Sequence, residues 1–574
     1  MYFSAVAFAL LTVIYLSLGA FAGEVDNVPR LGAVASLDAR CSQIGTDVLR
    51  DGGNAADAMI ATQFCVGVVG MYLTGIGGGG FFLVRDAKGQ FEFVDFRETA
   101  PAASNESMFN QNANLSVTGG LASGVPGELR GLEYLHEKYG SKPWNVLVDP
   151  SIKLARHGFV VGKDQEDVMN QTDTEIFLSP AWSSDFAPNG TRVNAGDVMT
   201  RKRYANTLET IRDKGAGAFY SGPLADQIIS AVQSTGGILT SADLKNYKVL
   251  RRPERRLSFG NYRLVTCGAP SGGIVGLTTL NVLKGYPDIW RPSAINATVH
   301  RLDEAIRFAY GARTKMGDPS FVEGMNEYQD NLLQEKTAAE IRSKIWDNST
   351  QPVEAYNPDG IESLETPGTS HVSTADASGM AVSLTSTINL WFGSMVMVPE
   401  SGIIMNNEMN DFSIPNSSNA FGFVASPENY VKPRKRPISS MSPYIVEHLH
   451  NNNLYLVIGG AGGSRIITAT VQGLWNALSR EMNSAATVKE PRLHDQLIPN
   501  RVRSMRECHY VADNDQILFE YSYNNATRRY LVDKGHEVGW MGHFSDLQTV
   551  RILPNGTFEA ASEPRQYESG GFAV

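Results

Sequence analysis

The chain has 574 residues, of which 42% are hydrophobic and 19% charged, with 55 glycines and a formal net charge of −10. This composition is ordinary for a globular protein and excludes a collagen-like, coiled-coil or disordered chain; the length allows several domains or one large layered domain. The acidic balance argues against nucleic-acid binding, which usually needs a basic face. The one basic cluster, residues 432–436 (KPRKR), is short and broken by proline, so we expect a solvated loop.

The N-terminus resembles a secretory leader. Residues 3–21 are almost wholly apolar and uncharged, and they end at Ala20-Phe21-Ala22, a pattern suited to signal peptidase. We therefore expect residues 1–22 to be a cleaved signal peptide, although no Lys or Arg precedes the apolar stretch. The alternative is an uncleaved anchor at the cell surface, because the stretch is nearly long enough to span a bilayer.

Potential glycosylation sites and cysteines agree with secretion. The chain has nine Asn-x-Ser/Thr sequons. Chance alone produces several in a chain this long, so they support secretion only mildly. The four cysteines are too few for a disulfide scaffold and include no CxxC pair; we favour one bridge, Cys41–Cys65, over four buried thiols. The other two cysteines are Cys267 and Cys508, and the sequons are at Asn105, Asn114, Asn170, Asn189, Asn296, Asn348, Asn416, Asn525 and Asn555.

The first half of the mature chain mixes short strands with helices. Residues 32–36 (GAVAS) predict a strand, and an alanine-rich helical stretch covers 41–69 with 54–58 (NAADA) at its centre. Residues 75–80 (GIGGGG) match GxGxxG, but two apolar runs separated by a turn follow them. A dinucleotide site needs a helix there, so we predict a hairpin with close backbone packing at the glycines. Residues 204–250 look helical, with a helix start at 240–243 (TSAD).

The second half gains strand character. Residues 255–266 alternate like a strand, and 299–313 predict a helix. A β-hairpin is expected over 372–387, around a turn at 376–379. A strand at 454–458 leads into a glycine-rich loop at 459–463 and a helix from 465 to about 478. Such a mixture indicates an α/β or α+β protein with a large sheet core.

Several chemistries are disfavoured by the motifs. The ten histidines are scattered, with no HExxH and no His/Cys cluster, so we expect no metal. No GxSxG elbow is present. The loop 459–463 (GGAGG) precedes a helix but carries no Lys, which excludes a Walker A loop. Its bared N–H groups can hold an anion or a developing oxyanion; the alternative is simple close packing of strand and helix.

Thr369 is a candidate nucleophile at the mouth of a predicted strand. A threonine hydroxyl needs a base, and the nearest is its own α-amine, with a pKa of about 7.7–8.0. That base exists only if the chain is cut just before Thr369, and Gly368 would tolerate the strained backbone that self-cleavage needs. Most threonines at strand starts are structural, so spacing alone leaves both interpretations open.

Several ordered motifs resemble the γ-glutamyltransferase family of N-terminal-nucleophile hydrolases. The resemblance covers essentially the whole chain after the leader. The motifs are GGNAADA (52–58), GIGGGGF (75–81), DFRETAP (95–101), SGVPGELRG (123–131), PSGG (270–273), GDP (317–319), TSH (369–371), TSTINLWFGS (385–394), NNEMNDF (406–412), KPRKRPISSMSP (432–443) and GGAGG (459–463).

The resemblance implies a four-layer αββα sandwich made as one proenzyme. Autoproteolysis between Gly368 and Thr369 would give a heavy subunit, 23–368, and a light subunit, 369–574. Thr369 would then attack the γ-glutamyl amide of glutathione, with its α-amine as base. Water, an amino acid or a dipeptide would accept the γ-glutamyl group, and no cofactor is implied.

The resemblance also assigns roles to residues. Thr387 matches the threonine that hydrogen-bonds to the nucleophile, and Gly462 and Gly463 match the oxyanion-hole donors. The substrate α-carboxylate would be held by residues that match at Arg97, Ser439 and Ser440. Its α-ammonium would be held by residues that match at Asn389, Glu408 and Asp411. Trp391 stands where many animal relatives carry tyrosine, so we expect a difference in acceptor preference or in the ratio of hydrolysis to transfer.

Two other interpretations remain. One is a catalytically inactive secreted relative that binds γ-glutamyl ligands or a protein partner. The other is a related amidase, such as a β-lactam acylase, on the same scaffold. The presence together of Thr369, Thr387, Arg97, Asn389, Asp411 and the pair Gly462 and Gly463 argues against the inactive relative. The complete set of residues matching those that bind the substrate zwitterion argues against the amidase.

Overall fold

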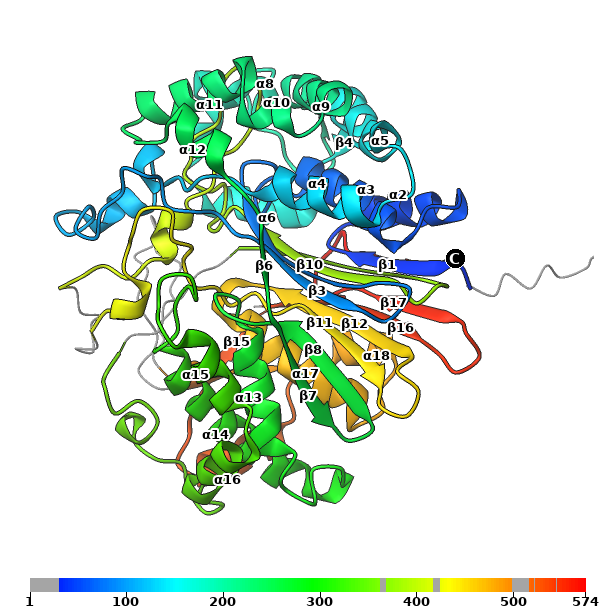
Figure 1. Ribbon diagram of the computed structural model, residues 1–574, viewed down its shortest axis with the longest axis vertical. Coiled ribbons are helices and arrows are strands. Elements are labelled where there is room, and N and C mark those ends of the chain that lie inside the picture. The colour runs from blue at the N-terminus through cyan, green and yellow to red at the C-terminus, as the bar shows by residue number, and fades with distance from the viewer. Residues whose placement is uncertain (1–29, 362–367, 417–423, 498–515, 521, 543–544) are drawn as a thin grey trace, which may run out of the picture.

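The computed structural model describes residues 30–361, 368–416, 424–497, 516–520, 522–542 and 545–574 (Figure 1). The predicted signal peptide, 1–22, and Cys508 lie outside these ranges. In the described part of the chain, no helix is both long and apolar enough to cross a membrane.

Two antiparallel sheets lie face to face at the centre of the molecule (Figure 1). The first has the strand order β18-β1-β9-β10-β2-β3-β6, and the second β17-β16-β12-β11-β8-β7. The strands of the first sheet are β1 (Gly32–Ser36), β2 (Gly79–Arg85), β3 (Phe91–Phe96), β6 (Leu250–Arg252), β9 (Ser370–Asp376), β10 (Ala381–Thr387) and β18 (Gly570–Ala573). Those of the second are β7 (Glu254–Phe259), β8 (Tyr262–Cys267), β11 (Tyr444–His448), β12 (Leu454–Ala461), β16 (Asp546–Ile552) and β17 (Phe558–Ala561).

Helices cover the outer face of each sheet (Figure 1). The first sheet is covered by α2 (Ala39–Arg50), α3 (Ala55–Val69) and α4 (Glu128–Tyr139), with α5 (Trp144–His157) and α9 (Lys202–Lys214) outside them. The second is covered by α13 (Gly273–Leu283), α14 (Ile295–Arg313) and α17 (Ile466–Leu478). This arrangement confirms the four-layer αββα sandwich that the sequence led us to expect.

The remaining strands lie outside the two central sheets, in one three-stranded and one two-stranded sheet. The remaining α-helices are α6 (Lys163–Gln171), α7 (Glu175–Leu178), α8 (Pro180–Phe186), α10 (Gly217–Tyr220), α11 (Pro223–Ser234), α12 (Ser241–Asn246), α15 (Met325–Leu332), α16 (Glu335–Lys344), α18 (Ser484–Lys489) and α19 (Asn525–Asp533). The strands are β4 (Phe159–Val160), β5 (Val198–Met199), β13 (Leu493–His494), β14 (Gln516–Glu520) and β15 (Glu537–Met541).

Three large apolar clusters fill the spaces between the layers. One joins the outer helices to the first sheet, through residues such as Phe64 and Phe82. A second lies between the sheets and includes Phe81 and Val457. The third joins α13, α14 and α17 to the second sheet. Phe81 and Phe82 belong to different clusters because successive strand side chains point to opposite faces.

The alanine-rich stretch forms two helices rather than one. Asn54, predicted at the centre of a single helix, instead begins α3. Its side chain accepts from the N–H groups of Ala56 and Asp57, and the Asp57 carboxylate accepts from the Asn54 N–H. This reciprocal capping box satisfies donors that an uninterrupted helix would not have, so it fixes the break.

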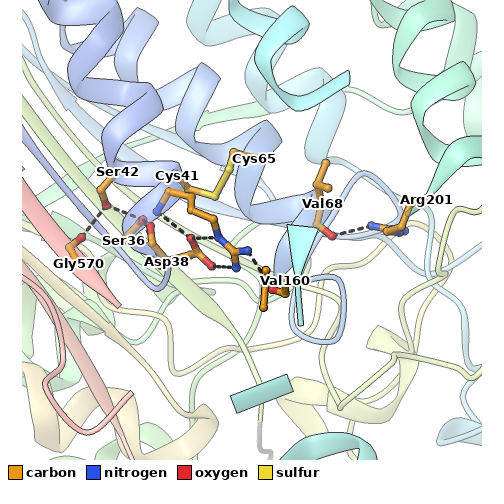
Figure 2. The surroundings of a disulfide bond; sticks show 10 residues. Ser36, Asp38, Cys41, Ser42, Cys65, Val68, Val160, Arg201 and Gly570 are labelled. Carbon is orange, nitrogen blue, oxygen red and sulfur yellow. Dashed lines mark hydrogen bonds and ion pairs between the residues drawn. A yellow bond between two sulfur atoms is a disulfide. The ribbon is translucent and has the colours of Figure 1, made fainter. Parts of the chain in front are cut away.

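A disulfide joins the two helices. Cys41 of α2 and Cys65 of α3 form it, with their Cα atoms 5.3 Å apart (Figure 2), and this is the pair favoured from the sequence. The Arg40 guanidinium contacts the Asp38 carboxylate and donates to the carbonyl of Val160. Cys267 is a buried free thiol.

Other sequence predictions have mixed outcomes. The stretch 75–96 forms the expected hairpin, since β2 pairs with β3 and no helix follows the glycines. The predicted single strand at 255–266 is wrong, because β7 and β8 form a hairpin that turns at Gly260. The hairpin of β9 and β10 and the helix start at Thr240 are confirmed.

The basic loop 432–436 is only partly solvated, contrary to expectation. Lys435 and Arg436 are buried. The Lys435 ammonium donates to the carbonyls of Glu428 and Tyr430, and burial lowers its pKa to about 8. Arg436 donates to the Arg97 carbonyl at 3.2 Å, so the loop packs behind the candidate site instead of facing solvent.

Candidate active site

Thr369 lies directly before β9, beside the end of β10. Its hydroxyl donates to the Thr387 hydroxyl across an Oγ1–Oγ1 distance of 3.4 Å. The backbone here is strained: Thr369 has a φ of 109°, a region that β-branched residues avoid. Gly368 has a φ of 119°, and a Cβ there would lie 1.9 Å from the Asn389 carbonyl oxygen, so only glycine fits.

The carbonyl oxygen of Gly368 is held by two backbone donors. The N–H groups of Gly462 and Gly463 donate to it at 3.3 Å and 3.1 Å. Both glycines have positive φ, 113° and 63°, which turns two successive N–H groups toward one point. Two converging donors on a carbonyl oxygen form the arrangement that stabilises an oxyanion. The loop therefore does more than pack β12 against α17.

Thr387 and Asn389 are fixed by backbone contacts. The Asn389 N–H donates to the Thr387 hydroxyl at 2.8 Å. The Asn389 side chain donates to the carbonyl of Asn407 at 3.1 Å, and the Asn407 side chain accepts from the Leu390 N–H at 3.0 Å. These bonds tie the segment after β10 to the segment that carries Glu408 and Asp411.

Arg97 extends from the end of β3 into the same site and is almost completely buried. Its Nη1 lies 2.5 Å from Glu408 Oε1, and its Nη2 contacts the Asp411 carboxylate and donates to the Ile438 carbonyl. One guanidinium thus joins two of the acidic residues expected around the substrate ammonium. One oxygen of Asp411, Oδ1, is buried and accepts no hydrogen bond, which leaves it available to a cationic ligand.

A further glutamate, Glu98, makes the site richer in carboxyl groups than predicted. Burial raises the pKa of Glu98 to about 8, against the opposing effect of the Arg97 guanidinium. Burial also raises the pKa of Glu408 well above its usual range, and the charges of Glu98 and Asp411 add to that rise. Near neutral pH, part of this cluster is therefore protonated, which lowers the cost of burying several carboxyls beside one cation.

Ser439 and Ser440 line the same pocket. The Ser439 N–H donates to the Pro270 carbonyl, and its hydroxyl accepts from the Met441 N–H at 3.2 Å. The Ser440 hydroxyl accepts from Arg313 Nη2 at 3.2 Å. Arg313 ends α14, is buried, and supplies a second guanidinium behind the serine pair that sequence reasoning missed.

These groups surround one small pocket. The structure brings eight of the ten predicted catalytic and substrate residues to its wall; Glu408 and Gly462 lie just behind it. Met441 and Ile466 also line the pocket and were not predicted. The ten lining residues are Arg97, Thr369, Thr387, Asn389, Asp411, Ser439, Ser440, Met441, Gly463 and Ile466. A larger surface groove on α19, lined by Asn525, Arg528, Arg529, Val532 and Trp540, has no nucleophile among those residues.

His371 follows the candidate nucleophile by two residues but does not face it. Its ring lies between the sheets, where Nδ1 contacts the Thr385 hydroxyl at 2.8 Å and Nε2 the Ser373 hydroxyl at 3.0 Å. Burial lowers the pKa of His371 to about 3, so the ring is neutral. The histidine of the TSH motif therefore joins the two sheets and is not positioned as the base for Thr369.

Comparisons with known proteins agree with this geometry. The family model for gamma-glutamyltranspeptidase matches residues 41–572. The glutathione hydrolase proenzyme of Arthroderma benhamiae is 46% identical over 98% of this chain and 99% of that protein. That of Escherichia coli is 34% identical over 94% of this chain and 91% of that protein.

Solved structures give the same result. A cephalosporin acylase from Bacillus halodurans, 25% identical, superposes with a TM-score of 0.81 over 97% of this chain and 98% of that chain. The gamma-glutamyltranspeptidase of Helicobacter pylori, 33% identical, superposes with a TM-score of 0.52 over 55% of this chain and 91% of that chain. A match of sequence and fold over nearly the whole chain leads to one conclusion: the chain belongs to the gamma-glutamyltranspeptidase family of enzymes.

Proposed function

We propose that this protein is a γ-glutamyltransferase and glutathione hydrolase that first cuts its own chain between Gly368 and Thr369. The observation that carries the proposal is the Gly368 carbonyl, whose oxygen accepts from two N–H groups while the Thr369 hydroxyl lies in the next residue. A carbonyl polarised by two donors, beside a hydroxyl and within a strained backbone, is prepared for attack.

Self-cleavage follows from that geometry. Thr369 Oγ1 attacks the Gly368 carbonyl carbon, and the negative charge develops on the oxygen held by Gly462 and Gly463. The peptide C–N bond breaks, the hydroxyl proton passes to the departing nitrogen, and an ester forms. Water hydrolyses this ester to a Gly368 carboxylate and restores the Thr369 hydroxyl. The products are a heavy subunit, 23–368, and a light subunit, 369–574, which remain together as a heterodimer through the shared sandwich.

The same donors then serve the substrate. Once the Gly368 carbonyl leaves, the N–H groups of Gly462 and Gly463 are free to hold the oxyanion of a γ-glutamyl amide. The new α-amine of Thr369 acts as base for its own hydroxyl and passes the proton to the leaving amine. The Thr387 hydroxyl, 3.4 Å from that of Thr369, orients the nucleophile in both reactions.

The charged walls recognise the free end of the γ-glutamyl group. Arg97, Ser439 and Ser440 would hold its α-carboxylate, because a planar guanidinium and two hydroxyls match two oxygens. Asn389, Glu408 and Asp411 would hold its α-ammonium. Arg97 pairs with Glu408 and Asp411, so the substrate zwitterion would exchange these ion pairs for its own. An α-peptide bond lacks this zwitterion and would be rejected.

The acyl group passes from the enzyme to water, or to an amino acid or dipeptide. Trp391, half-buried and packed against the first core cluster, is a candidate for setting the ratio of hydrolysis to transfer. An unchanged ratio in Trp391→Tyr would remove this role.

Secretion is part of the proposal. The leader-like residues 1–22 support it, and eight of the nine sequon asparagines are exposed, as glycosylation requires. Asn296 is the exception: it is half-buried and its side chain accepts from the Thr527 hydroxyl, so we expect it to remain unmodified.

A substrate comparison tests the activity. The purified protein should hydrolyse a γ-glutamyl anilide and leave the glutaryl analogue, which lacks the α-ammonium, almost untouched. Equal rates, or preference for the glutaryl compound, would favour a β-lactam acylase. No activity on either, with an uncut chain, would favour the inactive relative.

A further inference from the structure

A second cluster of reactive side chains lies away from the active site, at the other end of α14. In the described part of the chain, His300, Glu304 and His536 form the one group of three metal-ligating residues whose ligand atoms all lie within 4.8 Å of one another. All three are buried. The cluster is remote from Arg313, because His300 lies 13 positions before it on the same helix, about 20 Å along the axis.

Hydrogen bonds fix how the His300 ring presents itself. Its Nε2 lies 2.8 Å from the carbonyl oxygen of Trp346. A carbonyl only accepts, so Nε2 carries the proton, and a neutral ring then has its lone pair on Nδ1. That Nδ1 points at His536 Nε2, 2.8 Å away.

His536 is oriented in the same manner from its other side. Its Nδ1 lies 3.3 Å from Asp303 Oδ2. A carboxylate beside Nδ1 favours the tautomer with the proton there, which places the lone pair on Nε2. In that tautomer both facing nitrogens carry lone pairs and can bind one cation, whereas in the other tautomer the Nε2–H of His536 donates to His300 Nδ1.

Glu304 completes the group. Its Oε1 lies 3.8 Å from His536 Nε2. The Thr350 hydroxyl donates to Oε1 and the Tyr356 hydroxyl to Oε2, each at 2.7 Å. Each of the three side chains is thus oriented by an outer partner: a carbonyl for His300, a carboxylate for His536 and two hydroxyls for Glu304. Metal-ligating residues are held by outer partners of these kinds.

We propose that His300 Nδ1, His536 Nε2 and Glu304 Oε1 bind a zinc ion. Two imidazoles and one carboxylate suit Zn²⁺, whereas Mg²⁺ and Ca²⁺ prefer oxygen ligands alone. Ligand atoms of a tetrahedral zinc site lie about 3.4 Å apart, as Zn–N and Zn–O distances near 2.1 Å require. The observed separations of 2.8 and 3.8 Å lie on either side of that value, so small side-chain shifts suffice.

If the chain is cut as proposed, a zinc ion at this position would link the two subunits. His300 and Glu304 belong to the segment before Thr369, and His536 to the segment after it. Zinc would therefore join the two subunits of the cut protein far from the reacting atoms. Metal content itself does not depend on cleavage, so an uncut Thr369→Ala chain should bind the same amount. Failure of one proposal is then distinguishable from failure of the other.

Metal analysis of the purified full chain tests the site. We expect about one zinc per chain, and after chelation and Co²⁺ loading the visible absorption of tetrahedral Co²⁺. His536→Gln should abolish both signals, and Asp303→Asn should weaken zinc binding about 10–100-fold by removing the outer partner. His494→Gln, at another buried histidine, is the matched control and should retain zinc.

Three results would overturn the proposal. The first is a wild-type chain that carries no zinc and gives no Co²⁺ band, a measurement that needs no variant to fold. The second is a folded His536→Gln protein with undiminished zinc. The third is equal zinc loss in His494→Gln and His536→Gln, which would place the metal elsewhere or attribute the loss to misfolding.

Discussion

The backbone N–H of Gly463 donates to the carbonyl oxygen of Gly368 at 3.1 Å. This bond joins the loop that would stabilise the catalytic oxyanion to the peptide bond that the proposed self-cleavage would break. The uncut chain thus fills its own oxyanion site with the first carbonyl to be attacked. The relationship makes self-cleavage and catalysis depend on the same two donors, and it can be tested by changing them.

Gly462→Ala should slow both self-cleavage and turnover. Alanine is strained at a φ of 113°, so the backbone would rotate and misdirect the two N–H groups. Loss of one oxyanion donor costs about 10²–10³-fold in rate. The rate is read from the fraction of cut chain over time and from kcat on a γ-glutamyl anilide. Gly556→Ala has similar strain, with a φ of 80° and no atom within 4 Å, and should leave both rates unchanged.

Arg97→Lys should raise KM for γ-glutamyl substrates about 100-fold, since an ammonium cannot make the bidentate contact with a carboxylate. Self-cleavage should continue, because Arg97 does not contact Gly368 or Thr369 in the described contacts. Steady-state kinetics on the anilide measure the change, with the exposed Arg434→Lys as control. An unchanged KM would remove Arg97 from substrate binding.

Arg313→Gln should show whether Arg313 positions the Ser440 hydroxyl for substrate binding or only stabilises the fold. The guanidinium orients the Ser440 hydroxyl at 3.2 Å and adds positive potential behind the carboxylate subsite. We expect KM to rise about 10-fold, the effect of one lost charge-assisted contact, with kcat nearly constant. A parallel fall in kcat and thermal stability, without a change in KM, would show that Arg313 only supports the fold.

Thermal stability should fall as pH rises, because the buried Glu98 side chain loses its proton. Its pKa is about 8 in the folded chain and near 4.5 when unfolded. The folded chain therefore binds more protons between these values, and the free energy of unfolding decreases as pH rises through that window. Glu98→Gln mimics the protonated form and should flatten the slope, raising Tm at pH 8.5 by about 2 °C or more. The exposed Glu137→Gln should keep the wild-type slope; an equally steep slope in Glu98→Gln would contradict the assignment.

Local patterns in the sequence predicted most of the framework. Alternation identified the β9–β10 hairpin, and a capping sequence identified the start of α12 at Thr240. The same kind of signal was missed at Asn54, where the alanine content on both sides hid a capping box. At 255–266 continuous alternation hid the turn at Gly260, because a tight hairpin interrupts the pattern by only two residues.

Residues of the site were predicted only where they belong to motifs of the family. Spacing alone did not show whether Thr369 is a nucleophile or a structural residue. The family resemblance indicated its role and its partner residues. Glu98 and Arg313 were missed because their function depends on burial beside Arg97 and Ser440, which sequence distance does not reveal. His300 and Glu304 do share a helix face at i and i+4, a signal that was available. Their partner His536 lies more than two hundred residues away, so no local motif could join them.

The central claim is that the chain is cut between Gly368 and Thr369. N-terminal sequencing of the purified protein tests it directly. We predict two fragments on a denaturing gel, with the smaller beginning Thr-Ser-His-Val at Thr369, and a single uncut chain for Thr369→Ala. A wild-type protein that remains one chain, or a smaller fragment that begins at any other residue, would contradict the account.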